Sequence, residues 1–97
     1  MSPDAKIKVR FLLPSEGGRA TAIAGDRYGC PMRFKTENLE CRFVLEGPQT
    51  FELGKSYDIA VKFMSPDAAF SCFQESRDIE LWEGKVIAKG EMIEWLA

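Results

Sequence analysis

The three cysteines are the side chains most able to do chemistry, because the sequence contains no histidine. Cys30, Cys41 and Cys72 are widely spaced and form no CxxC pair, so no zinc site is expected. A reactive cysteine usually has a neighbouring base, and histidine is missing. Cys41 lies in an alternating apolar series and is predicted to be a small core residue, whereas Cys30 and Cys72 could be exposed. We expect free thiols, as in a reducing cytoplasm.

Other nucleophiles and phosphate-binding motifs form no catalytic pattern. Ser15, Ser71 and Ser76 have no histidine partner, and no G-x-S-x-G turn occurs. The sequence has no G-x-x-x-x-G-K-[ST] loop, and its glycines fall in turn-like segments. We therefore expect no enzyme activity, no bound nucleotide and no cofactor.

Four carboxylates gather towards the end of the sequence, at Glu75, Asp78, Glu80 and Glu83. Paired carboxylates act as acids and bases, or hold a divalent ion, when they converge in a cleft. Asp78 and Glu80 instead alternate with apolar residues, which predicts a shared outward face in solvent. No metal site is expected here.

Composition indicates one globular domain over residues 1–97. Hydrophobic residues make up 45% of the sequence and charged residues 29%, and the net charge is −2. Apolar runs are far shorter than the roughly 20 residues of a membrane span, and the first residues include no apolar signal segment. Residues 1–50 hold eight basic and six acidic residues, and residues 51–97 hold five and nine. We expect a cytoplasmic protein without a membrane partner.

Period-two alternation of apolar and polar residues dominates the sequence and predicts β-strands. The alternating segments are residues 6–13, 39–46, 57–64 and 78–82. Residues 85–95 are predicted to form a final strand, in which Gly90 marks a bulge or a close contact. Shorter strands are expected at 19–24 and 32–36, and residues 67–75 are left as a loop, a short strand or one helical turn. The pattern predicts an all-β sandwich or closed barrel.

Four segments resemble, in order, the C-terminal barrel domain of elongation factor Tu. Glu16-Gly17-Gly18-Arg19 matches the E-G-G-R turn of that family, although Ala20-Thr21-Ala22 replaces its His-Thr-Pro. Residues 28–36 (YGCPMRFKT) are similar to Y-R-P-Q-F-Y-F-R-T, and Leu53-Gly54 resembles the P-G-D turn. Residues 82–90 (WEGKVIAKG) resemble R-E-G-G-R-T-V-G-A-G, without its second glycine. The resemblance extends from about Lys6 to Ile93.

The resemblance implies an all-β fold, a six-stranded antiparallel Greek-key closed barrel. Closure removes exposed sheet edges that would otherwise pair with other chains. Gly17, Gly18 and Gly84 would then occupy turns that need a positive φ angle.

The resemblance also raises an RNA-binding alternative, because the barrel of elongation factor Tu contacts the T-stem backbone of aminoacyl-tRNA. In that family a D-V-T-G turn follows the F-R-T strand. Here Asn38-Leu39-Glu40-Cys41 puts a carboxylate where the family has a hydroxyl, and a carboxylate repels phosphate. Arg19, Lys35 and Lys85 remain as candidate contacts to an RNA backbone. RNA binding is therefore the disfavoured alternative.

The favoured hypothesis is a non-enzymatic protein-binding module with an accessory, regulatory or immunity-type role. Trp82 lies out of phase with the buried residues of its strand, and Trp95 lies near the end of the sequence. Tryptophan beside charged residues such as Glu83 is typical of interface anchors. Each tryptophan could instead cover an open end of the barrel. Phe70 and Phe73 have the same two interpretations, and a plug in the barrel is favoured for both.

Overall fold

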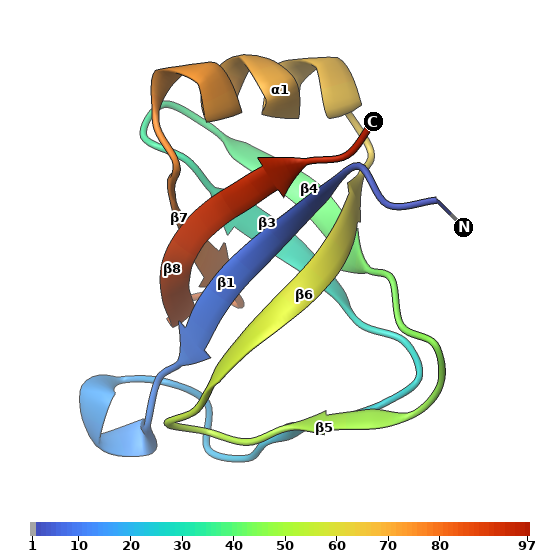
Figure 1. Ribbon diagram of the computed structural model, residues 1–97. Helices are drawn as coiled ribbons and strands as arrows, with labels where there is room; N and C mark the ends of the chain where they lie inside the picture. Colours follow the sequence, from blue (N-terminus) through green and yellow to red (C-terminus); the bar gives the residue numbers. More distant parts are fainter. Residues whose placement is uncertain (1) are drawn as a thin grey trace.

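The computed structural model describes residues 2–97 and shows a closed barrel of six antiparallel strands (Figure 1). Its strands follow one another around the barrel in the order β1, β6, β4, β3, β7 and β8. The barrel strands are β1 (Ala5–Phe11), β3 (Gly29–Arg33), β4 (Asn38–Phe43), β6 (Ser56–Phe63), β7 (Asp78–Trp82) and β8 (Val86–Trp95). A separate two-stranded sheet pairs β2 (Ile23–Gly25) with β5 (Gln49–Phe51). A short 3-10 helix (Pro14–Glu16) follows β1, and an α-helix, α1 (Pro66–Glu75), joins β6 to β7.

The connections form a Greek key. Among the barrel strands, β3, β4 and β6 are consecutive and lie side by side. β1 precedes them, is joined to β3 by a long connection, and lies beside β6. Pairing of β1 with β8 closes the barrel. The predicted fold class, a six-stranded antiparallel Greek-key barrel, is therefore confirmed.

Alternation decides which side chains enter the core. Ile7, Val9 and Phe11 of β1 are fully buried, and the alternating apolar residues of β6 and β7 are buried with them. The alternation expected over residues 6–13 breaks at its end, where Leu13 is 38% exposed and Leu12 is buried. The chain leaves β1 after Phe11 and enters the 3-10 helix, so period-two alternation no longer applies there.

Gly90 confirms the predicted close contact. A Cβ atom at this position would lie 1.9 Å from the carbonyl oxygen of Lys8, because β8 packs tightly on β1 here. Gly17 and Gly84 have the expected positive φ angles, 88° and 70°. Gly18 does not, and its Cβ would instead lie 2.4 Å from the carbonyl oxygen of Leu12. Glycine is therefore required at position 18 because a side chain would not fit there.

Residues 67–75 form more helix than the sequence pattern suggested. Pro66–Glu75 is a ten-residue α-helix that covers one open end of the barrel (Figure 1). Ala69 and Cys72 are buried and Phe73 is partly buried, which is the i, i+3, i+4 spacing of one helix face. Ser65 precedes the helix and Pro66 occupies its first position, which suits proline.

The shorter predicted strands are displaced. The strand expected at 19–24 is reduced to β2, and the one expected at 32–36 begins earlier, at Gly29. β5 was not anticipated. Pro31 has no N–H to donate, and β3 pairs with β7 only beyond it, at Met32 and Arg33. Within residues 2–97, no helix has both the length and the apolar composition needed to cross a membrane.

Candidate functional site

The structure divides the predicted site residues between the two ends of the barrel. Trp82 lies where β7 meets the turn into β8, and Trp95 lies at the far end of the ten-residue β8. The two tryptophans therefore do not form one surface. We call the end with the β7–β8 turn and the β2–β5 sheet the hairpin end, and the end covered by α1 the α1 end (Figure 1).

Arg19, Glu83 and Tyr28 form a hydrogen-bonded cluster at the hairpin end. Nη1 of Arg19 lies 2.5 Å from Oε2 of Glu83, and Nε of Arg19 donates to the carbonyl oxygen of Thr21 at 3.0 Å. The hydroxyl of Tyr28 donates to the same carboxylate oxygen of Glu83. Burial and the Glu83 carboxylate raise the pKa of Tyr28, which keeps the phenol protonated. Arg19 and Glu83 thus satisfy each other within the chain.

Trp82 is half-buried on the outer side of the barrel. The guanidinium carbon of Arg33 lies 4.7 Å from the centre of its ring, in a cation–π contact. One face of the indole is therefore covered by the chain itself.

The candidate RNA contacts do not converge. Lys85 is exposed in the β7–β8 turn, close in the chain to Glu83, whose partner is Arg19. Lys35 is exposed in the β3–β4 turn at the α1 end. A phosphate backbone held by Arg19 and Lys85 would therefore not reach Lys35 without crossing the length of the barrel.

The outward cations of β1 are also largely balanced. Nζ of Lys8 lies 3.9 Å from Asp58, and Nη1 of Arg10 lies 3.0 Å from Glu16. The basic excess of the first 50 residues is thus offset in part by ion pairs.

Trp95 lies at the centre of an aromatic cluster at the α1 end. Its ring stacks on Phe63 of β6, with 6.1 Å between centroids and an angle of 13°. Two phenylalanines of α1 contact the same ring, Phe70 at 5.1 Å and Phe73 at 6.3 Å. Trp95 therefore holds α1 against the barrel, as the capping interpretation requires.

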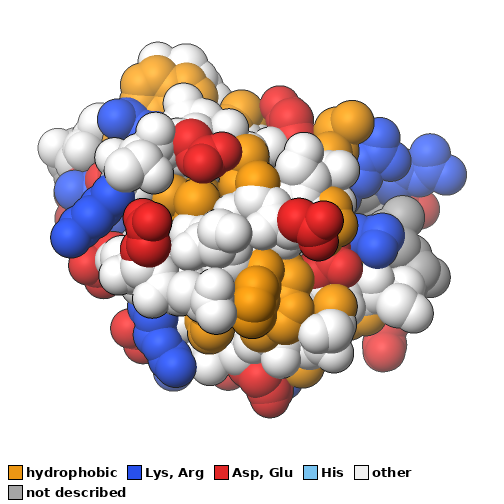
Figure 2. Space-filling model, turned by 90° about the horizontal axis from the view of Figure 1, so that it is seen from above, with side chains coloured by type: hydrophobic (Ala, Val, Ile, Leu, Met, Phe, Trp, Pro, Cys, Tyr) orange, Lys and Arg blue, Asp and Glu red, His pale blue; other side chains and the backbone are white. Residues whose placement is uncertain are grey.

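The α1 end nevertheless leaves apolar surface uncovered. Phe70 is 38% exposed, and Leu96, directly after Trp95, is 44% exposed. We call Phe70, Trp95 and Leu96 the α1-end patch. Met64, at the end of β6 just before α1, is 74% exposed. Viewed from this end, hydrophobic side chains reach the surface between acidic ones (Figure 2).

The α1-end patch lies on acidic elements, although Arg77 covers the ring of Phe73 and Lys35 lies at the same end. α1 contains Asp67 and Glu75 and no basic residue, and Glu94 precedes Trp95. The carboxylates grouped in the sequence do not converge, since Glu80 is 3.9 Å from Lys89 and Asp78 is exposed. Among residues 2–97, no group of three or more histidine, cysteine, aspartate or glutamate side chains is placed to hold a metal ion.

A hollow of about 950 Å³ lies beside β3 and β4. The charged residues in its lining are Asp26, Arg27, Glu40 and Arg42, two of each sign. The hollow therefore offers neither a net charge for an ionic ligand nor a nucleophile paired with a base.

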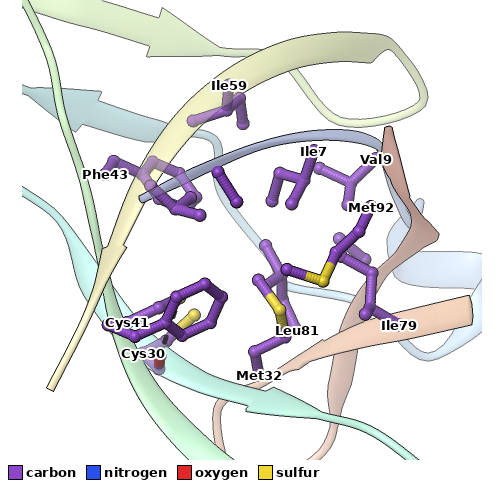
Figure 3. Close-up of a cluster of buried hydrophobic side chains, with 14 of the residues drawn as sticks. Ile7, Val9, Cys30, Met32, Cys41, Phe43, Ile59, Ile79, Leu81 and Met92 are labelled. Atoms are coloured by element: carbon purple, nitrogen blue, oxygen red, sulfur yellow. Dashed lines mark hydrogen bonds between the residues drawn. The ribbon is translucent and has the colours of Figure 1, made fainter. Parts of the chain in front are cut away.

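All three thiols are buried, including those of Cys30 and Cys72. Cys30 and Cys41 lie opposite each other on β3 and β4 and face the core beside Phe43 and Met32 (Figure 3). The thiol of Cys41 donates to the carbonyl oxygen of Cys30 at 3.3 Å. The spacing in the sequence gave no motif for this pair, which only the register of the β3–β4 hairpin brings together.

Comparison of the sequence with protein-family models and with curated proteins finds no match.

Proposed function

We propose that this chain is a non-enzymatic protein-binding module that docks a partner on its α1 end. The observation that carries the proposal is the exposure of Phe70, whose ring contacts Trp95, and of Leu96, the residue that follows Trp95. Hot spots of protein interfaces are rich in aromatic residues held in place by their neighbours. Trp95 is held by Phe63 beneath it, so the exposed edge of the cluster is already ordered before a partner arrives.

The acidic residues around the α1-end patch indicate which class of protein would bind there. Asp67, Glu75 and Glu94 lie on the elements that carry the α1-end patch. A protein with an apolar centre and a basic rim would complement this surface, and opposite rim charges would speed the encounter. The hairpin end offers less, because Arg19, Glu83 and Tyr28 already satisfy one another.

RNA-backbone binding has less support. Lys35 and Lys85 lie at opposite ends of the barrel, and Arg19 is paired with Glu83. The resemblance to the elongation factor Tu barrel is compatible with an accessory, regulatory or immunity-type role near translation, and that role remains part of the proposal.

Affinity capture from lysate tests this function, with and without ribonuclease and with two matched variants. Phe70→Ala removes an exposed aromatic at the α1 end. Leu13→Ala removes an apolar side chain of equal exposure, 38%, near the hairpin end. We expect Phe70→Ala to reduce recovery of a ribonuclease-resistant partner by about tenfold or more, the effect of losing a hot spot. Leu13→Ala should leave recovery unchanged.

Circular dichroism of both variants checks that the barrel is intact. Equal recovery by the Phe70→Ala variant and the unmodified chain would show that the α1 end is not the docking surface. Loss of all captured material on ribonuclease treatment would instead favour the RNA alternative.

A further inference from the structure

Cys30 and Cys41 occupy positions from which a disulfide can form. They are directly opposed in the antiparallel β3–β4 pair. Hydrogen bonds from Phe43 N to Tyr28 O and from Phe34 N to Glu37 O, both 2.9 Å, place the cysteines in the hydrogen-bonded class of cross-strand pair. Cα atoms in such pairs are about 5.5 Å apart, within the range of about 4.4–6.8 Å found for disulfides. Both side chains point to the same side of the sheet, into the core.

The environment of Cys30 favours its thiolate. The neighbouring Cys41 thiol has the largest effect, and the Tyr28 hydroxyl and the Trp82 backbone N–H act in the same direction. These groups lower the pKa of Cys30, whereas the neighbouring Cys30 and burial raise the pKa of Cys41. The Glu83 carboxylate opposes ionisation of Cys30, but it is bound by Arg19. Cys30 therefore ionises more readily than Cys41.

Cys30 precedes the short seam between β3 and β7. The two strands pair only at Met32 and Arg33, and Pro31 cannot extend the ladder. The register of β7 with β8 shifts between Leu81 and Trp82, at the end of β7. A molecule as small as hydrogen peroxide needs only a small opening of this short seam to reach the thiol.

We propose that Cys30 and Cys41 are an oxidisable thiol pair that hydrogen peroxide converts into a disulfide across β3 and β4. The Cys30 thiolate attacks one peroxide oxygen, the O–O bond breaks, and protonation of the leaving oxygen gives water and a sulfenic acid at Cys30. The Cys41 sulfur then attacks the Cys30 sulfur and expels the sulfenic oxygen as a second water. The two thiols lose two electrons and two protons, and the peroxide is reduced to two waters.

The disulfide should be readily reduced again. Cβ atoms of opposed strand residues are about 4.5–5.5 Å apart, whereas a disulfide draws them to about 3.5–4.5 Å. The bond therefore pulls the two strands together, and strained disulfides have more oxidising potentials.

The test is treatment of the folded full chain with hydrogen peroxide, followed by intact mass and peptide mapping without reduction. We expect loss of two hydrogens from the chain, a Cys30–Cys41 linked peptide, and recovery of both thiols with dithiothreitol. Cys72→Ser is the matched control and should be oxidised like the unmodified chain. Cys41→Ser should yield no intrachain disulfide and should leave Cys30 as a sulfenic acid that dimedone traps.

A second variant separates this role from simple burial. Tyr28→Phe keeps the ring that packs on Phe43, with 4.9 Å between centroids, and removes the hydroxyl that helps to lower the pKa of Cys30. We expect it to slow disulfide formation severalfold while leaving the circular dichroism spectrum unchanged. Oxidation of Cys72 before Cys30, or disulfide formation only in denaturant, would overturn the proposal and show that the pair is ordinary core.

Discussion

The two ends of the barrel are closed by different chemistry. At the hairpin end, Arg19, Glu83 and Tyr28 satisfy one another, and Phe51 of the β2–β5 sheet packs inside against Phe11 and Phe43. At the α1 end, Trp95 and the phenylalanines of α1 close the barrel. Part of this second cluster remains in solvent.

The difference indicates where a partner can gain free energy. A polar group that already has its hydrogen bonds gains little from a second partner, because it would exchange one bond for another. An exposed apolar side chain gains about 25 cal/mol for each Å² that a partner covers. A partner that covers the α1 end can therefore gain binding free energy, whereas the hairpin end contributes chiefly to stability.

Phe43→Ala should have the largest effect and tests the closure of the hairpin end. Phe43 is buried and contacts Tyr28 at 4.9 Å and Phe51 at 5.4 Å, so its removal leaves a cavity that these rings cannot refill. We expect the free energy of unfolding to fall by about 3–5 kcal/mol. Urea titration followed by tryptophan fluorescence measures it. A loss under about 1 kcal/mol would mean that the aromatic packing at this end does not hold the barrel closed.

Phe43 also illustrates what the sequence could predict. Its strand alternates apolar and polar residues, and alternation is a local property that follows from the two-residue repeat of a strand. Ile7, Val61 and Leu81 lie on the apolar phase of their alternating segments, and all are buried. Leu13 breaks the pattern because its strand ends two residues earlier.

The helix was underestimated for a local reason as well. Ser65 and Pro66 directly follow the alternating segment at residues 57–64, and such a pair can end a strand or start a helix. The repeat of Ala69, Cys72 and Phe73 covers barely one turn and was too short to outweigh the strand pattern around it.

The candidate sites were less predictable because they depend on contacts between distant residues. Glu83 meets Arg19 across 64 positions and Tyr28 across 55. A repeating pattern in the sequence does not predict contacts between residues so far apart in the chain. The Cys30–Cys41 pair was accessible in principle, since a tight turn near Lys35 and Thr36 sets the register that opposes them.

Trp95→Ala should loosen the packing of α1 on the barrel while leaving the hairpin end intact. The side chain is half-buried, so we expect a loss of about 2 kcal/mol in unfolding free energy, less than for a fully buried ring. α1 loses its contacts through Phe70 and Phe73 and should open locally before the barrel does. Hydrogen exchange of the amides of residues 66–75 should become faster.

Trp82→Ala is the matched control for this change. Trp82 is also half-buried, but its named contact is Arg33 on the outer side of the barrel. We expect a smaller loss of stability and unchanged exchange in α1. Equal acceleration of α1 exchange in both variants would show that the helix responds to global stability and is not held by Trp95.

Tyr28→Phe should have the smallest effect on stability. The pH dependence of its unfolding free energy tests whether the hairpin-end cluster keeps the phenol protonated. The hydroxyl donates to Glu83, and its loss should cost about 0.5–1.5 kcal/mol at neutral pH. The pKa of Tyr28 is raised above its ordinary value of 10.0 by burial and by Glu83, so the folded state keeps a proton that the unfolded state releases. The stabilisation is therefore complete below pH 10 and declines as the pH rises further. Urea titrations between pH 8 and pH 11 should show a steeper alkaline decline for the unmodified chain than for Tyr28→Phe, and parallel curves would mean that the phenol is not held protonated by the cluster.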